Sequence, residues 1–449
     1  MDTAMTHTPE KRTNQRFSNW SGSVNTNPDA FYYPATIAEV QHIIRTLPAG
    51  QRVRAVGGGH SFTPVAAGAQ AMISLDKLAG IINVDRERKR VRFLAGTRLY
   101  RVPEYLQPFG LALANQGDID NQSVAGAIST STHGTGIEWT GFAGTVTGLS
   151  LIDATGTLRT YSIDDDPDLL RLIAVSVGAL GIIVEVEMQC VDAFDLLARE
   201  TSDNLDDVLD SWDERTRAVD HFEAFWFPHT DKAMIKNNTR LAPGEPAPGG
   251  EPKKRGRITQ FIEDDLVGNG AFAAALTVAR IAPKTTAFLN GIATDAMAAN
   301  TYRSRAHEVF ATPRRVRFHE TEFAVPLADG PETVREIRRE IDRRGWLIPF
   351  PLELRSTAAD DVALSTANGR ESMYIAFHVP RAMNPHDYFP HIEPIFIAAG
   401  GRPHWGKMHT RGREFFAQAY PRFDEFCTLR ETMDPTRTFG SPHLTQLFG

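Results

Sequence analysis

Apolar residues recur with two different periods along the first part of the chain. Behind the capping-box pattern Thr36-Ile37-Ala38-Glu39 they follow helical spacing, and the predicted helix has its apolar positions at Ile37, Val40, Ile44 and Leu47. Short apolar runs bounded by turn residues predict strands at 52–56, 91–95, 146–153, 158–162 and 182–186. This mixture predicts an α+β first domain over 16–192, preceded by a disordered lead.

The pattern changes after Asp192. Strands are predicted at 221–227, 316–325, 347–355 and 373–379. Helices are predicted at 271–310, around Val334, Ile337 and Ile341, and at 415–429. The Pro- and Gly-rich run 241–256 predicts a surface loop. Strands with intervening helices predict a second α+β domain.

Composition and charge restrict the function classes. The chain has 449 residues, 42% hydrophobic and 23% charged, which is typical of a soluble globular protein with two or three domains. A net charge of −7 argues against a nucleic-acid partner. Cys190 and Cys427 are too few for a disulfide framework, and the polar N-terminus has no signal-peptide core, so we expect a cytoplasmic protein. The most apolar run, 270–282, is too short to span a bilayer.

The densest chemical signal is Gly57-Gly58-Gly59-His60-Ser61-Phe62, which directly follows the predicted strand 52–56. Glycine adopts backbone angles closed to other residues and lets a ligand approach the chain. Successive N–H groups in such a loop form an anion site suited to a pyrophosphate. The spacing differs from the Rossmann fingerprint, because the third glycine is missing and His60 stands where a helix should open.

Two further segments carry chemistry. Residues 115–136 are rich in small and hydroxylated side chains, which offer donors to a large flat ligand without bulk. The second is Gly401-Arg402-Pro403-His404-Trp405-Gly406-Lys407. The sequence contains no HExxH motif, Cys/His cluster, P-loop or Ser/His/Asp signature, so we expect neither a metal site nor hydrolase chemistry.

Together these segments resemble the vanillyl-alcohol-oxidase-type FAD flavoproteins, and among them the aldonolactone oxidoreductases, with the alditol (sugar-alcohol) oxidases as close relatives. The resemblance extends from about Pro34 to the end of the sequence. It implies a two-domain FAD-binding (VAO/PCMH-type) fold of class α+β. The implied parts are an FAD-binding domain, an α+β substrate (cap) domain and a C-terminal segment that returns to the FAD-binding domain, over 16–192, 193–412 and 413–449.

The resemblance also implies which residues hold FAD. At the position of His60 a ring nitrogen bonds covalently to the C8 methyl group of the flavin, whereas a local hydrogen bond is the ordinary alternative. The residues implied to form the wall against the flavin are Gly117, Ser123, Gly126, Thr130, Thr132, His133 and Gly134. The alternative interpretation is a tight turn built of small residues. Ile183 would flank the adenine, although an ordinary core strand explains it equally well.

Leu352-Glu353-Leu354-Arg355 is the best catalytic candidate. Residues two apart on a strand share a face, so Glu353 and Arg355 should emerge together while the leucines enter the core. A surface ion pair would contribute little stability. The resemblance instead implies a substrate pair, in which Arg355 binds a sugar oxygen and Glu353 orients the arginine and anchors a hydroxyl group.

Lys407 and His378 complete the implied catalytic set. Lys407 would stabilise the anionic reduced flavin, and a solvated lysine is the alternative. His378 occupies a strand position where the alditol oxidases carry threonine, which puts an alditol substrate in doubt and suggests a role in substrate choice. Glu320 and Glu322 share one face of a strand, and the sequence assigns them no role.

We therefore predict FAD-dependent oxidation of a gulono-, galactono- or arabinono-1,4-lactone at the carbinol next to the carbonyl. Hydride would pass to flavin N5, and O2, an acceptor protein or a dye would reoxidise the cofactor. Two alternatives stay open. An alditol oxidase would convert a polyol into an aldose and H2O2, and a non-catalytic carbohydrate-binding protein would keep the fold without the reaction.

Overall fold

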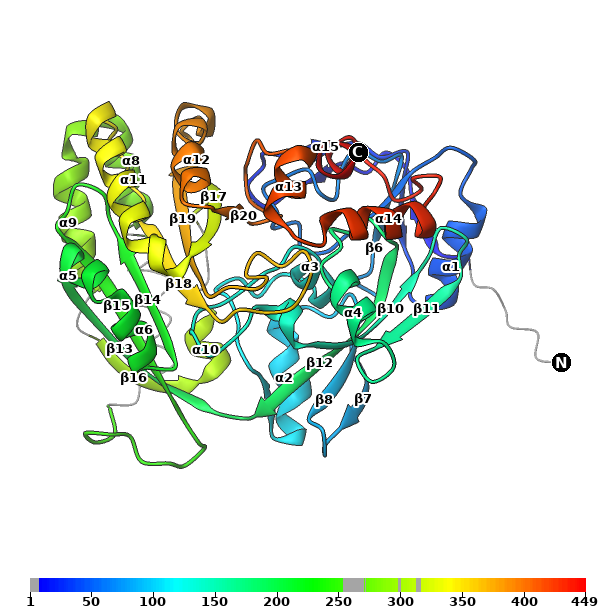
Figure 1. Cartoon of the computed structure of the whole chain (residues 1–449), viewed down its shortest axis with the longest axis horizontal. Helices are drawn as coiled ribbons and strands as arrows, with labels where there is room; N and C mark the ends of the chain where they lie inside the picture. The colour runs from blue at the N-terminus through cyan, green and yellow to red at the C-terminus, as the bar shows by residue number, and fades with distance from the viewer. Residues whose placement is uncertain (1–7, 253–269, 271, 298–299, 312–315) are drawn as a thin grey trace.

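The computed structural model describes residues 8–252, 270, 272–297, 300–311 and 316–449. They form two domains that lie side by side (Figure 1). The N-terminal half, in blue to cyan, lies together with the red C-terminal helices, and the green to orange segments form the other domain. Among the described residues, no helix combines the length and the apolar composition needed to cross a bilayer.

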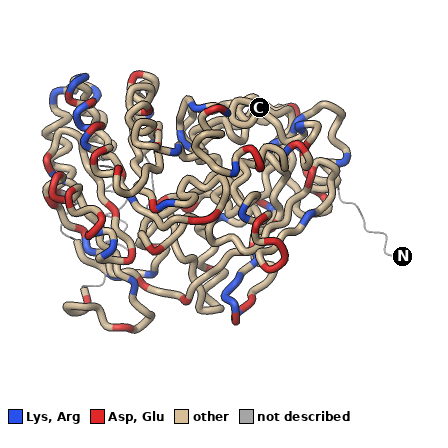
Figure 2. Tube along the Cα trace, in the orientation of Figure 1, with Lys and Arg blue, Asp and Glu red and all other residues tan. Residues whose placement is uncertain are grey.

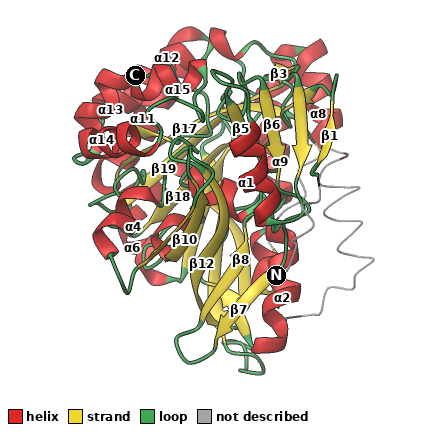
Figure 3. Cartoon of the chain, turned by 90° about the vertical axis from the view of Figure 1, so that its right-hand side faces the viewer, coloured by secondary structure: helices red, strands yellow, loops and turns green. Residues whose placement is uncertain are grey.

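Two sheets build the first domain. A four-stranded sheet contains, in order, β1 (Glu10–Arg12), β4 (Ala30–Tyr33), β6 (Ala71–Ser74) and β5 (Val53–Val56). A six-stranded sheet contains, in order, β11 (Leu158–Ser162), β10 (Val146–Ile152), β12 (Ile182–Asp192), β8 (Arg90–Leu94) and β7 (Ile81–Asp85), with β9 (Leu111–Leu113) also paired to β12. Figure 3 shows β7, β8, β10 and β12 running next to one another.

Short helices and one ribbon complete this domain. They are α1 (Ile37–Thr46), α2 (Val102–Leu106), α3 (Val124–Ser129), α4 (Pro167–Ile173) and the ribbon of β2 (Phe17–Ser18) with β3 (Asn25–Thr26). The predicted cap of α1 is confirmed, because Thr36 Oγ1 accepts the N–H of Glu39 at 3.2 Å. The predicted disordered lead is wrong at β1, which pairs with β4; residues 1–7 lie outside the described residues.

The second domain is built on an eight-stranded sheet. Its strands are, in order, β16 (Asn300–Arg305), β13 (Asp195–Asn204), β15 (Lys232–Leu241), β14 (His221–Trp226), β18 (Leu352–Thr357), β19 (Ser372–Pro380), β17 (Phe318–Pro326) and β20 (Arg402–Pro403). The accompanying helices are α5 (Leu205–Asp210), α6 (Trp212–Ala218), α8 (Phe272–Ile281), α9 (Thr286–Met297), α10 (Ala306–Phe310), α11 (Gly330–Arg344) and α12 (Phe389–Ala398). Figure 2 shows both acidic and basic residues on the helices of this domain, while α5 carries acidic residues alone.

Two predicted elements of this domain need correction, and a third is confirmed where the structure describes it. The expected helical run 271–310 is interrupted by β16, which pairs along β13, and residues 271, 298 and 299 lie outside the described residues. The strand expected at 347–355 begins only at β18, because Pro349 and Pro351 lack the N–H that a ladder requires. The loop expected at 241–256 contains no helix or strand from 242 to 252, and its last four residues are not described.

The helix expected at 415–429 is two helices, α13 (Arg413–Ala419) and α14 (Phe423–Met433), since Pro421 cannot continue a helix. With α15 (Pro442–Phe448) they pack into the apolar core of the first domain, where Phe416, Phe423 and Phe448 share one cluster with β8, β10 and β12. The C-terminal segment thus contributes to the same core as the first sheets.

The strand that leads into the glycine run is tied to this C-terminal segment. The buried side chain of Arg54 donates to the carbonyl oxygens of Val65 at 3.0 Å and of Phe439 at 2.8 Å. The N–H of Val53 donates to the carbonyl oxygen of Thr438 at 2.8 Å. Residues at the far end of the chain therefore fix the start of the loop.

Candidate active site

Two cavities adjoin each other: one lies within the first domain, and the other lies where the first domain meets the second. The glycine-loop cavity has a volume of about 1030 Å³, and its lining includes Gly57, Gly58, Gly59, Ser123, Gly126 and Ile183. The charged cavity has a volume of about 910 Å³, and its lining includes Gly117, Glu320, Glu322, Glu353, Arg355, His378 and Lys407. His60, Ser61, Gln122 and Thr130 line both cavities, so the two meet at these residues.

The glycine run is packed too closely for side chains. A Cβ atom at Gly57 would overlap Ser123 Oγ, and one at Gly58 would overlap the backbone carbonyl oxygen of Asn121. Gly59 has a φ of +67°, in the region that favours glycine. Ser123 itself caps α3 by accepting the N–H of Gly126 at 3.2 Å. The glycines therefore allow the loop to lie directly on the small-residue segment.

Residues of the late signature hold the other side of this loop. The N–H of Phe62 donates to the carbonyl oxygen of Gly406 at 2.7 Å, and Thr63 Oγ1 donates to that of Trp405 at 3.1 Å. Trp405 is fully buried and packs on Phe416 of α13. The three segments singled out in the sequence thus meet at one place.

His60 lies at the junction of the two cavities. Its ring stacks on Trp20 with centroids 5.6 Å apart and an interplanar angle of 24°. Burial, together with the positive charges of Lys407 and Arg98, lowers the pKa of His60 to about 4. The ring is therefore neutral near pH 7, and a neutral imidazole keeps one nitrogen with a lone pair.

Most of the predicted wall residues reach one of the cavities. Ser123, Gly126, Thr130 and Ile183 line the glycine-loop cavity. Phe62, Gly117, Thr130, Thr132 and His133 line the charged cavity. Gly134 lines neither of these two cavities; a Cβ atom there would overlap Asn115 Oδ1 and the carbonyl oxygen of Gln116. Gly134 therefore permits a close crossing of two backbone segments.

Arg355 is surrounded by carboxylates in the charged cavity. Its Nε lies 2.8 Å from Glu223 Oε2, its Nη1 lies 2.5 Å from Glu353 Oε1, and its Nη2 contacts Asp118. Lys236 Nζ lies 3.3 Å from Glu223 Oε1. The three carboxylates outweigh burial and raise the pKa of Arg355. With Arg355 only 6% exposed, this is not the surface ion pair considered as the alternative.

The same three carboxylates have the spacing of a metal site. Ligand oxygens of Asp118, Glu223 and Glu353 all lie within 4.8 Å of one another. The guanidinium of Arg355 contacts each of these carboxylates and so supplies the positive charge that a metal ion would supply in such a site. As predicted from strand periodicity, Leu352 and Leu354 point the other way into the core of the second domain.

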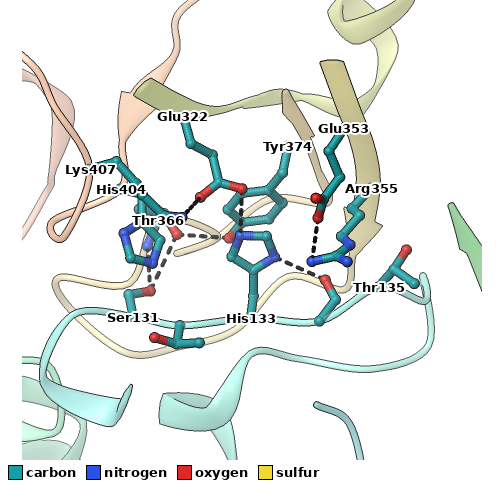
Figure 4. Close-up of polar contacts among 12 residues, drawn as sticks. Ser131, His133, Thr135, Glu322, Glu353, Arg355, Thr366, Tyr374, His404 and Lys407 are labelled. Atoms are coloured by element: carbon teal, nitrogen blue, oxygen red, sulfur yellow. Dashed lines mark hydrogen bonds and ion pairs between the residues drawn. The ribbon is translucent and has the colours of Figure 1, made fainter. Parts of the chain in front are cut away.

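A second charged group is built on β17. Glu320 Oε2 lies 2.5 Å from Lys407 Nζ, and Glu320 Oε1 lies 3.4 Å from His378 Nε2. Glu322 Oε1 lies 3.2 Å from His133 Nε2, and Glu322 Oε2 lies 3.9 Å from Lys407 Nζ (Figure 4). Burial lowers the pKa of Lys407, but the carboxylates outweigh burial and raise it. Lys407 is therefore a paired cation, in contrast to the solvated lysine of the alternative interpretation.

Sequence reasoning missed part of this site. Asp118 and Glu223 contact Arg355 from segments 237 and 132 residues away, and no local pattern marks either residue. The shared strand face of Glu320 and Glu322 was visible in the sequence, but their contacts with Lys407 and His133 depend on the tertiary fold.

Comparisons with known proteins agree with this geometry. Residues 28–162 match an FAD-binding domain, and residues 186–447 match the D-arabinono-1,4-lactone oxidase family. L-gulono-1,4-lactone dehydrogenase of Mycobacterium tuberculosis is 36% identical over 435 residues, which cover 96% of this chain and 99% of that protein. L-gulonolactone oxidase of Mus musculus is 29% identical over 447 residues, which cover 96% and 98%.

A solved structure shows the same fold. Cholesterol oxidase from B. sterolicum superposes with a TM-score of 0.83 at 15% identity and covers 98% of both chains. This similarity confirms the predicted two-domain FAD-binding architecture and, at that identity, says nothing about the substrate. From the match over 186–447 and the close relative, the chain belongs to the D-arabinono-1,4-lactone oxidase family of FAD-dependent oxidoreductases.

Proposed function

We propose that this protein oxidises a sugar-1,4-lactone at the carbinol next to the ring carbonyl. The observation that carries the proposal is the junction of the two cavities. The glycine-loop cavity meets a cavity walled by Arg355, Lys407 and four carboxylates. The names of the relatives, a gulonolactone oxidase and a gulonolactone dehydrogenase, support a lactone as substrate.

The residues of the glycine-loop cavity fit FAD. Gly57, Gly58 and Gly59 line the cavity without side chains, which leaves their backbone open to a pyrophosphate. In this proposal the loop holds the pyrophosphate, Ile183 lies against the adenine, and Ser123, Gly126 and Thr130 lie along the flavin. A bound flavin would supply the acceptor for a hydride from the substrate carbon.

The charged cavity fits a polyhydroxylated ring. Carboxylates such as Glu353 accept hydrogen bonds from sugar hydroxyl groups, and the N–H groups of Arg355 donate to sugar oxygens. Lys407 places a positive charge beside the junction of the cavities, where negative charge develops during the reaction. The contacting aromatic rings of Phe318 and Phe350 add an apolar part to the lining of this cavity.

His60 is the proposed attachment point for the cofactor. This is supported by its place on the lining of both cavities and by the lowered pKa, which leaves a nitrogen lone pair near pH 7.

We also propose that residues 16–192 and 413–449 form the FAD-binding unit and 193–412 the cap. Two free, buried cysteines support a cytoplasmic location, and the proposed oxidant is O2 or an acceptor protein.

Anaerobic mixing of the FAD-loaded protein with candidate substrates tests the proposal. Gulono-, galactono- and arabinono-1,4-lactone should bleach the flavin absorbance, with at least one far faster than an acyclic polyol such as sorbitol. A faster reaction with the polyol would favour an alditol oxidase. If neither the lactones nor the polyol bleach the flavin, catalysis on both substrate classes is overturned.

Acid precipitation tests the attachment of the cofactor. The flavin should remain with the precipitated wild-type protein, and the His60→Ala protein should release it into the supernatant.

A further inference from the structure

The ring of His378 is held in one orientation. His378 lies on β19 directly opposite Glu320 of β17, and its Nδ1 lies 2.9 Å from the backbone carbonyl oxygen of Pro351. A carbonyl oxygen only accepts, so Nδ1 carries the hydrogen. Phe318 contacts the ring edge to face, with centroids 4.9 Å apart and an interplanar angle of 88°. Nε2 is therefore the nitrogen whose protonation changes.

Glu320 stays charged beside that nitrogen. Burial raises its pKa, but Lys407 and His378 outweigh burial and lower the pKa of Glu320 to about 2. Its Oε2 is held by Lys407 at 2.5 Å, while its Oε1 lies 3.4 Å from His378 Nε2. A distance of 3.4 Å is long for a hydrogen bond. The carboxylate therefore lies where it would stabilise a positive charge on the His378 ring.

His60 is the proposed attachment point of the cofactor, and two further histidine rings line the charged cavity. His404 Nδ1 accepts the N–H of Gly406 at 3.0 Å, so its neutral ring carries the hydrogen on Nε2 and offers no free lone pair. His133 is held much as His378 is, with Nδ1 2.9 Å from the carbonyl oxygen of Gly134, but its Nε2 lies closer to its carboxylate, at 3.2 Å from Glu322. Its ring is also covered by Tyr374, with centroids 3.5 Å apart (Figure 4).

The remaining charges around His378 come from three elements. Glu322 lies on the same face of β17, Lys407 lies in the late signature, and Glu353 with Arg355 faces the cavity from β18. These charged side chains are held in position, because each of them forms an ion pair. His378 and His133 share the same fixed tautomer; His378 differs in the longer distance between Nε2 and its carboxylate, 3.4 Å against 3.2 Å, and in an edge-to-face rather than a stacked ring contact.

We propose that His378 Nε2 accepts the hydroxyl proton of the substrate carbinol and that Glu320 is the positioning residue for the imidazolium that forms. This inference rests on the proposed lactone oxidation. The O–H bond breaks and its proton moves to Nε2, while the carbinol C–H bond gives its hydrogen and electron pair to the bound flavin. A C=O bond forms on the substrate, and His378 afterwards releases the proton to water.

A first test needs no turnover. The sample is the FAD-loaded protein labelled with ¹⁵N-histidine, and the NMR resonances of His378 are assigned by their loss in His378→Asn. At about pH 8 they should report a hydrogen on Nδ1 and none on Nε2. On acidification Nε2 should gain a proton. A ring that carries hydrogen on Nε2 at about pH 8, as an imidazolium or as the other tautomer, overturns the proposal.

The second test is the pH profile of anaerobic flavin reduction by the lactone. His378→Asn should slow reduction by about 10²–10⁴-fold and remove the loss of rate at acid pH, since a general base contributes on that scale. Glu320→Gln should move the acid limb to lower pH, because the imidazolium loses its neighbouring charge. His319→Asn is the matched control: its side chain lies on the opposite face of β17 from Glu320, so rate and acid limb should be kept.

The outcomes separate the two claims. If no lactone reduces the flavin of the wild-type protein, the proposed function fails, and this inference fails with it. If the wild-type protein is reduced but His378→Asn keeps the rate and the acid limb, only the inference fails. It fails likewise if His133→Asn removes the acid limb and His378→Asn does not.

Discussion

The two cavities are built on opposite principles. The glycine-loop cavity is lined mainly by small residues and backbone, and its shape depends on side chains that are absent at Gly57 and Gly58. The charged cavity depends on side chains that are present, with Arg355 and Lys407 each held by more than one carboxylate. The first should therefore be sensitive to added atoms, and the second to removed charges.

Among the changes that test this comparison of the two cavities, the largest effect is expected from Arg355→Ala. The FAD content should stay near that of the wild-type protein, because Arg355 does not line the glycine-loop cavity. Flavin reduction by the lactone should slow by about 10²–10³-fold, the scale of losing one preorganised electrostatic donor. Stopped-flow bleaching under anaerobic conditions measures this rate.

Arg355→Lys and Glu353→Gln complete that series. Lysine keeps the charge that the three carboxylates need but lacks the planar fork, so only part of the rate should return. Glu353→Gln should slow reduction less than Arg355→Ala. A folded, FAD-loaded Arg355→Ala protein that reacts at the wild-type rate would show that the charged cavity plays no part in the reaction.

The converse change is Gly58→Ala. The added methyl group meets the backbone carbonyl oxygen of Asn121, which no rotamer change relieves, so the loop must move. The purified protein should retain only a minor part of its flavin, as measured by the ratio of flavin to protein absorbance. Gly291→Ala in α9 is the matched control, because nothing lies within 4 Å of that site and its flavin content should be unchanged.

The smallest effect is expected at the seam between the two domains. His221 Nδ1 donates to the carbonyl oxygen of Thr135 at 2.6 Å, and its Nε2 accepts from Arg240 at 3.0 Å. Burial and Arg240 lower the pKa of His221 to about 3. Since the unfolded chain binds a proton below about pH 6.5, stability is present above that pH and is lost on acidification towards the folded pKa.

This contribution amounts to about 2 kcal/mol between about pH 8 and pH 5, from the linkage of the two pKa values. Urea denaturation at a series of pH values should therefore show a shallower pH dependence for His221→Asn than for the wild-type protein. Equal slopes for the two proteins would mean that His221 is protonated in the folded state as easily as in the unfolded chain.

Local pattern was sufficient where a residue and its function lie on one segment. Strand periodicity placed Glu353 and Arg355 on the cavity side and both leucines in the core, and the glycine run marked the loop. It failed where the partner comes from elsewhere. The pairing of β14 with β18 brings Glu223 opposite Arg355, and only the tertiary fold determines that register.

The same limit explains the misread elements. Nothing within 300–305 distinguishes a strand from a helix end, and β16 exists because the edge of β13 offers hydrogen-bond partners. The strand β18 begins later than expected because the two prolines before it have no backbone N–H group to donate. Both prolines are plain in the sequence, but their missing N–H groups matter only because a neighbouring strand would have to accept from them.

The bond between Arg54 and Phe439 joins residues 385 positions apart and has a consequence for biosynthesis. Domains usually fold as units, N-terminal first, while the ribosome is still translating. Here β5, the strand before the glycine run, forms hydrogen bonds with Thr438 and Phe439, which are among the last residues to be translated. We therefore expect the pocket to be complete, and able to load its cofactor, only once the whole polypeptide has been made.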